Sequence, residues 1–142
     1  QKAGKDSFLT INYDGVFEEK NQYAVLAATS SVEQRMVEYL RPQSCVSLKE
    51  AVDLVIRTWA VGDRAQGQAH ELRESHEGAK ESSDQLVTDS QTLLTHMRQR
   101  MEKKMIECAL LDRHVSGTSK YRTLGSVELK ALLPSDLSSA LT

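Results

Sequence analysis

The sequence predicts an α+β fold in which helices cover antiparallel strands as the layers of a sandwich. Three observations predict it. An Asp-Gly dipeptide separates two strand-like runs near the N-terminus, an amphipathic helix spans Ser47 to Val61, and the last third of the chain returns to strand-like runs. Helices and strands of this kind bury their apolar faces by packing on one another. At 142 residues the chain is one domain of ordinary size or a fragment of a larger one.

The N-terminal strands come first. The runs F-L-T-I-N-Y (8–13) and V-F-E-E (16–19) flank Asp14-Gly15. Both turn residues tolerate positive φ, so these runs predict an antiparallel hairpin. The next run, Y-A-V-L-A-A (23–28), is continuous and apolar. Its small residues predict a central strand with another layer packed closely on it.

A first helix is predicted from about Val32 to Arg41. Ser30 and Glu33 offer a capping box, in which the two side chains satisfy backbone N–H groups at the start of the helix. Pro42 ends the helix, since proline cannot continue it. Four apolar residues share one face of it: Val32, Met36, Tyr39 and Leu40.

The clearest helix spans Ser47 to Val61. Ser47 and Glu50 form a second capping box, and Gly62 is expected to close the helix. Two consecutive β-branched residues and the lone tryptophan suggest a face buried against a sheet. The residues expected on that face are Leu48, Val52, Val55, Ile56 and Trp59.

The chain changes character after Gly62. Residues 63–89 contain seven acidic and three basic residues, and Leu72 is the only large apolar residue between Gln66 and Ser83. Such a stretch predicts a solvated helix or a mobile insertion. Apolar spacing returns at Leu86, Leu93, Leu94, Met97 and Met101. That helix ends on four basic residues, which the helix dipole favours there: Arg98, Arg100, Lys103 and Lys104.

The C-terminal segment reads as sheet followed by helix. Met105–Asp112 predicts a mostly buried strand, and Ser119–Leu124 predicts an edge strand that pairs back after a turn at Gly117. Ser126–Leu133 predicts a short amphipathic helix that stops before Pro134, whereas the tail 135–142 is too short and polar to place. The chain is therefore divided into 1–62, a polar helical insertion 63–104, and 105–142.

The order of these segments resembles the second half of a proteasome subunit. The pieces are F-L-T-I-N-Y-D-G, Y-A-V-L-A-A-T and S-L-K-E-A-V-D-L-V-I, in that order. The ending, M-I-E-C-A-L-L-D-R followed by K-Y-R-T-L and V-E-L-K-A-L-L, is similar to that of α-type subunits, especially the actinobacterial kind. The resemblance covers roughly two thirds of the chain. Each motif alone is weakly specific, so the order and spacing carry the resemblance.

The resemblance implies an N-terminal-nucleophile hydrolase fold, a four-layer αββα sandwich of antiparallel sheets, with about half of it in this chain. It also implies a non-catalytic role. The α-type subunits form heptameric rings, gate entry to the proteolytic chamber and dock activators. The implied partners are other proteasome-like subunits in a ring and an ATPase activator. Ring contacts would come from the polar face of the helix 48–61 and from the segment 63–104.

Two other functions stay open at the level of sequence. The chain could belong to a β-type threonine peptidase whose nucleophile lies outside it. It could also be a helical interaction module in which 63–104 is the working part. An aspartate followed by Ser-Gly supports the nucleophile in catalytic subunits; here the nearest match, D-R-A-Q-G (63–67), lacks the serine. Gln1 has no hydroxyl or thiol to act as a nucleophile. No catalytic residue is therefore predicted, and the chain is not expected to be an enzyme by itself.

No metal-binding or cofactor-binding residue is predicted either. His70 and His76 lie six residues apart and so on different helix faces, without a cysteine at ligand spacing. Cys45 and Cys108 are expected to be reduced thiols, with Cys108 inert within a buried strand. The methionines at 97, 101 and 105 are expected to pack in the core.

Composition excludes some classes of partner. The net charge of −2 and the short basic run near residue 100 give no indication of nucleic-acid binding. No apolar run approaches the ~20 residues that span a bilayer, and no signal peptide opens the chain. A cytoplasmic protein without membrane contact is the expectation.

Overall fold

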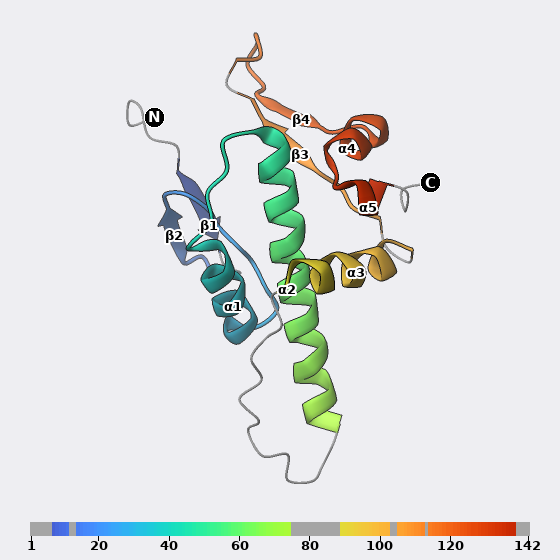
Figure 1. Ribbon diagram of the computed structural model, residues 1–142. Coiled ribbons are helices and arrows are strands. Elements are labelled where there is room, and N and C mark those ends of the chain that lie inside the picture. Colours follow the sequence, from blue (N-terminus) through green and yellow to red (C-terminus); the bar gives the residue numbers. More distant parts are fainter. Residues whose placement is uncertain (1–6, 12–13, 75–88, 103–104, 113, 139–142) are drawn as a thin grey trace. The chain divides into compact units, whose positions relative to one another are not determined.

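The computed structural model describes residues 7–11, 14–74, 89–102, 105–112 and 114–138 (Figure 1). It has helices and antiparallel strands, so the α+β class is confirmed; the four-layer sandwich stays a prediction. The chain divides into two compact units, 1–43 with 61–84 and 44–60 with 85–142. The described elements are β1 (Phe8–Ile11), β2 (Phe17–Lys20), α1 (Ser30–Leu40), α2 (Leu48–Glu74), α3 (Ser90–Met101), β3 (Ala109–Leu111), β4 (Tyr121–Thr123), α4 (Ser126–Leu132) and α5 (Ser135–Ser138).

The N-terminal hairpin is confirmed. Strands β1 and β2 pair antiparallel, with Phe8 opposite Lys20 and Ile11 opposite Phe17. Gly15 has φ +82°, a conformation that glycine adopts without strain. The Asp14 carboxylate accepts a hydrogen bond from the backbone N–H of Val16 at 3.2 Å, which holds the turn in place.

The strand predicted at 23–28 is wrong. The structure has a coil there, which connects β2 with α1 (Figure 1). A strand requires a hydrogen-bonded neighbour, and each sheet in the described part of the chain contains two strands, β1 with β2 and β3 with β4. The run therefore has strand-like composition without a partner strand among the described residues.

Helix α1 begins earlier than its sequence suggests. Thr29, rather than Ser30, is the N-cap, and its hydroxyl accepts a hydrogen bond from the N–H of Val32 at 3.4 Å. Val32, Met36 and Leu40 are buried as predicted. The apolar stripe of this helix thus contributes to the core of the first unit.

Gly62 does not end helix α2, which is a correction to the sequence reading. The helix continues to Glu74 and includes Asp63 and the residues after it. A Cβ atom at position 62 would lie 2.5 Å from the sulfur of Met36 on α1. Gly62 is therefore required for close packing of two helices rather than for a helix end. Of the predicted insertion 63–104, residues 75–88 and 103–104 lie outside the described part of the chain, including Leu86, Lys103 and Lys104.

The start of α2 confirms its capping box with one variation. The Ser47 hydroxyl accepts from the N–H of Glu50 at 3.2 Å, while the Glu50 carboxylate accepts from Val46 at 2.8 Å, one residue further out than expected. Val52 and Ile56 are buried, but Val55 is 59% exposed and Trp59 is 38% exposed. The buried face is therefore rotated from the predicted one, and the prediction for Val55 is wrong.

In the second unit, helix α3 packs its apolar residues inward as predicted. Leu93, Leu94, Met97 and Met101 are all buried. Asp89 is the N-cap and accepts from the N–H of Thr92 at 3.1 Å. Helix α5 contacts α3 and contributes the fully buried Leu137, so the tail that sequence could not place supplies a core residue.

The C-terminal hairpin is confirmed, but its burial is not. Strand β3 pairs antiparallel with β4, with Leu111 opposite Tyr121. The predicted strand from Met105 is only three residues long in the structure, and exposure alternates along 105–112. Met105 is 83% exposed, which corrects the expectation that it packs in the core. A two-stranded sheet covered on one side leaves the alternate side chains in solvent.

Candidate functional site

The segment nearest to a catalytic loop lies within a helix. Residues 63–67 continue helix α2, and Ala65 is 4% exposed. A helical backbone does not form the loop that was considered for support of a nucleophile. The position of Asp63 within helix α2 therefore gives no support to a catalytic role for it.

The histidines that the structure describes, His96 and His114, belong to no cluster of metal-ligand side chains. Within the described residues, no three His, Cys, Asp or Glu side chains come close enough together to hold an ion. His96 is half-buried on α3, and His114 is exposed in the turn before β4. The backbone N–H of His114 donates a hydrogen bond to the Asp112 carboxylate at 2.9 Å, an interaction that aspartate commonly makes in turns. The side chains of His70 and His76 lie outside the described part of the chain.

The two cysteines are free and differ in environment. Cys45 is exposed in the loop before α2, whereas Cys108 is half-buried beside β3. Burial raises the pKa of the Cys108 thiol, which lowers the fraction present as reactive thiolate. The predicted low reactivity of Cys108 thus has a physical cause, although the residue is less buried than predicted.

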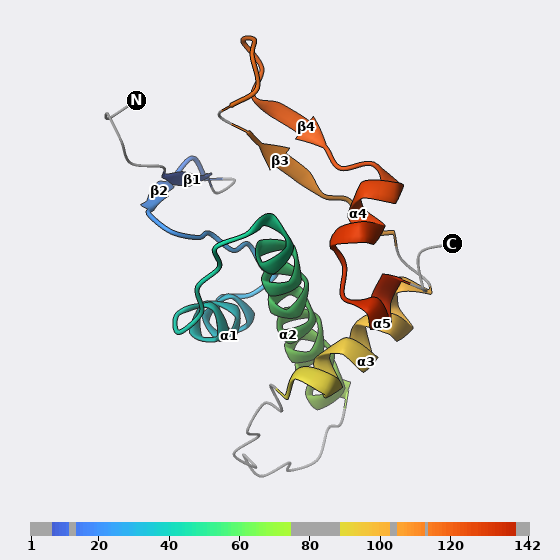
Figure 2. The ribbon, with the colours of Figure 1, turned by 45° about the horizontal axis from the view of Figure 1, so that its top comes forward.

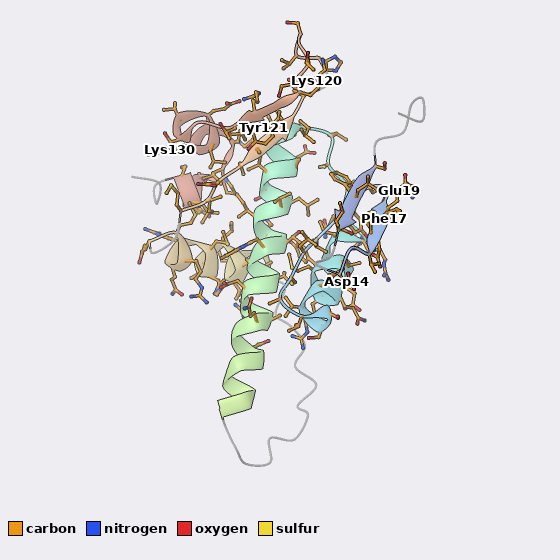
Figure 3. All side chains as sticks on the ribbon, turned by 180° about the vertical axis from the view of Figure 1, so that it is seen from behind. Asp14, Phe17, Glu19, Lys120, Tyr121 and Lys130 are labelled. Carbon is orange, nitrogen blue, oxygen red and sulfur yellow. The ribbon has the colours of Figure 1, made fainter. Side chains whose placement is uncertain are left out.

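The apolar surface that the sequence did not predict is the main candidate site. On the β1–β2 hairpin, alternation places Leu9, Ile11 and Phe17 on one face. These three side chains are 64%, 70% and 70% exposed. The labelled Phe17 projects outward from the hairpin in Figure 3. Three large apolar side chains in solvent on one sheet face mark an interaction surface.

A second apolar surface lies on the C-terminal hairpin and helix α4. Met105, Tyr121 and Val127 are 83%, 59% and 83% exposed. They line a groove of about 800 Å³. The elements that carry or flank these residues, strands β3 and β4 and helix α4, follow one another in Figure 2. Lys130 also lines the groove, so its wall is apolar with a charged rim. We call this the C-terminal groove.

An ion pair fixes one wall of the C-terminal groove. The Arg122 guanidinium on β4 donates two hydrogen bonds to the Glu128 carboxylate on α4, at 2.8 and 2.9 Å. The hydrogen bond from Arg122 holds the pKa of the Glu128 carboxyl below its ordinary value. Both side chains are exposed, so this pair orients α4 on the sheet more than it stabilises the fold.

A smaller apolar cavity lies beside helix α3. It measures about 220 Å³ and is lined by Trp59, Met97 and Met101 together with the segment 105–108. Drug-sized ligands occupy sites of roughly 300 Å³ or more, so this cavity admits at most one side chain or a small fragment. It is a packing gap within the second unit.

Sequence reasoning predicted no site residue, and it missed these surfaces. A signal was present in the sequence: the alternation L-T-I places Leu9 and Ile11 on one face, and a hairpin closed at Asp14-Gly15 places Phe17 opposite Ile11 on that face. Which side of a hairpin is covered depends on tertiary packing, which alternation alone does not reveal.

No protein family, curated protein or solved structure that was compared with the chain matches it. Among the described residues, no helix combines the length and the apolar character needed to cross a membrane.

Proposed function

We propose that this chain is the C-terminal half of a non-catalytic, α-type proteasome ring subunit. The proposal rests on the resemblance of the segments at 8–15, 47–56 and 105–133. In the structure these segments form a hairpin, a capped helix, and a second hairpin followed by a helix. Their order along the sequence is the one that the resemblance implies. That order is the observation that supports the proposal most. The fourth piece of the resemblance, residues 23–29, is coil rather than the strand that it implies.

The exposed apolar surfaces fit this role. A sheet face bearing Leu9, Ile11 and Phe17 in solvent is unfavourable unless another layer covers it. Burying apolar surface contributes roughly 25 cal/mol per Å², so three large side chains supply several kcal/mol of packing energy. In the proposed role, the remaining layers of the sandwich and the adjacent subunits cover these faces.

The ring is the feature to test first. The protein, produced from its complete reading frame, is examined by native mass spectrometry and by class averages in electron microscopy. A heptameric ring is expected, either alone or with the β-type subunits of the same source. A particle that stays monomeric with and without those subunits contradicts the proposal.

A pair of matched variants locates the ring contact. Ring contacts were expected from the polar face of α2; Val55, which was predicted to be buried, is exposed and adds an apolar residue to the surface of that helix. Val46 lies 93% exposed before the helix. Val55→Asp is expected to weaken the ring, because a charge in an interface loses its hydration. Val46→Asp makes the same chemical change outside the helix and is expected to leave the ring intact.

Activity is the second test. The chain is expected to hydrolyse no fluorogenic peptide, since no nucleophile is assigned to it. Turnover that is lost on mutation of a residue in this chain contradicts the non-catalytic role.

A further inference from the structure

The coil at Tyr23–Ala28 combines strand-forming composition with a backbone that pairs with no strand in the described part of the chain. The run Y-A-V-L-A-A is continuous and apolar, and it follows directly after β2 and Asn21-Gln22. Within the described residues no backbone hydrogen bond joins this segment to a strand. Leu26 is 71% exposed. A backbone of this kind is a template for an added strand.

A groove lies along the first half of this segment. It measures about 600 Å³ and is lined by residues 19–25 together with Glu33 and Val37 of α1. Tyr23 and Val25 are half-buried along it. The groove thus offers apolar wall and unpaired backbone side by side, within a single compact unit of the chain.

The charges at the groove are mainly negative. Glu19 and Glu33 line it, and Glu18 lies next to it in the sequence. The one cation there, Lys20, forms an ion pair with Glu18 at 2.5 Å. The groove lining itself has two carboxylates and one ammonium, a net charge of −1, and the adjacent Glu18 makes the set −2. Within the described residues neither Glu19 nor Glu33 lies at ion-pair distance from a cation. The charge of Glu33 nevertheless helps to raise the pKa of the Lys20 ammonium, after the larger effect of Glu18, so Lys20 offsets part of the negative charge that a cationic ligand would meet.

We propose that Tyr23–Ala28 is a docking site for an extended, basic segment of a separate protein. That segment adds to the unpaired backbone as a strand and places a lysine or arginine against Glu19 and Glu33. Backbone hydrogen bonds supply affinity in this mode of recognition, and the side-chain pocket and charge supply specificity. This site does not rest on the proposed ring function, whose resemblance assigns the same segment to a strand of the protein's own sandwich. Pairing of residues 23–28 within the protein would support that role and exclude this site.

The test uses a defined probe. A fluorescein-labelled peptide of sequence V-K-V-T-V-K-V is compared with V-E-V-T-V-E-V by fluorescence anisotropy against the protein from its complete reading frame. The lysine peptide is expected to bind, and to bind more weakly as salt is raised, because exposed charges are screened. Equal binding of the two peptides, or binding of neither, overturns the proposal.

Two glutamate variants test the site itself. Glu33→Gln is expected to weaken binding of the lysine peptide about fivefold, the upper end for a solvent-exposed ion pair. Glu38→Gln is the matched control on the same helix, since Glu38 is exposed and does not line the groove. Circular dichroism establishes that both variants fold. Equal weakening by both variants, or by neither, contradicts the placement of the ligand.

Amide hydrogen exchange identifies what covers the backbone. The amides of residues 23–28 are expected to exchange rapidly in the free protein and to be protected by the lysine peptide. Protection before peptide is added means that the protein's own chain or a second copy covers the segment, and this overturns the proposal. The ring assay does not use Glu33, so failure of this site and failure of the proposed function are read separately.

Discussion

The close approach of α1 and α2 at Gly62 predicts a specific energetic coupling. Gly62→Ala places a Cβ atom 2.5 Å from the Met36 sulfur, 3.1 Å from its Cγ and 3.3 Å from its Cε. Overpacking of this kind costs about 1–3 kcal/mol. Replacing a helical glycine with alanine offsets about 1 kcal/mol of that cost. The net expectation is a loss of roughly 0–2 kcal/mol in the free energy of unfolding.

The same substitution has the opposite expected sign once Met36 is shortened. In a Met36→Ala background the new methyl has space, so Gly62→Ala is expected to stabilise by about 1 kcal/mol. The double-mutant cycle therefore has a coupling energy of about 1–3 kcal/mol. Urea unfolding followed by circular dichroism measures all four proteins of the cycle.

Gly67 provides the matched control on the same helix. A Cβ atom there meets no atom within 4 Å. Gly67→Ala is therefore expected to stabilise by up to about 1 kcal/mol with or without Met36. If Gly62→Ala behaves like Gly67→Ala in both backgrounds, then α1 does not pack against Gly62 and the reasoning fails.

Three further predictions concern a cap, an ion pair and the thiols. Asp89→Ala removes the N-cap of α3 and is expected to lower the free energy of unfolding by about 1 kcal/mol. Asp89→Ser is expected to keep most of the capping stability, because serine is also a good N-cap residue, and thermal unfolding distinguishes the two variants. Arg122 lowers the pKa of Glu128 in the folded protein. The stability that this ion pair adds is therefore present above the unfolded pKa of Glu128 and is lost as the pH falls through its folded pKa. NMR titration should show the Glu128 pKa rising toward its ordinary value in Arg122→Gln, and an unchanged pKa contradicts the pairing. Cys45 should react with a thiol reagent faster than Cys108 when each is followed in the variant lacking the other; the reverse order refutes the assigned environments.

Local rules predicted the elements whose signals lie within a few residues. The Asp14-Gly15 hairpin, the Ser47 cap and the stop before Pro134 follow from turn, capping and proline chemistry, which act over short distances. The apolar spacing of α3 also predicted its buried face correctly, because every residue of that face that the structure describes is buried.

The wrong predictions all depend on which residues from other parts of the chain pack against an element. Gly62 reads as a helix end by sequence, yet its role depends on Met36, a residue on another helix. The coil at Tyr23–Ala28 has the composition of a strand, but pairing requires a partner that composition does not specify. The interaction surfaces were missed for the same reason, since exposure of Phe17 and Met105 depends on packing around them.

The turn between β3 and β4 has a practical consequence for labelling. Residues 114–119 are exposed, and Gly117, at φ +124°, has no atom within 4 Å of a Cβ position. A backbone hydrogen bond of 2.8 Å from Asp112 to Lys120 closes the hairpin below this turn. Exposed turns closed in this way accept inserted residues with little loss of stability. An epitope or a fluorophore-binding sequence placed beside Gly117 would therefore allow the protein to be isolated and tracked while β3 and β4 keep their register.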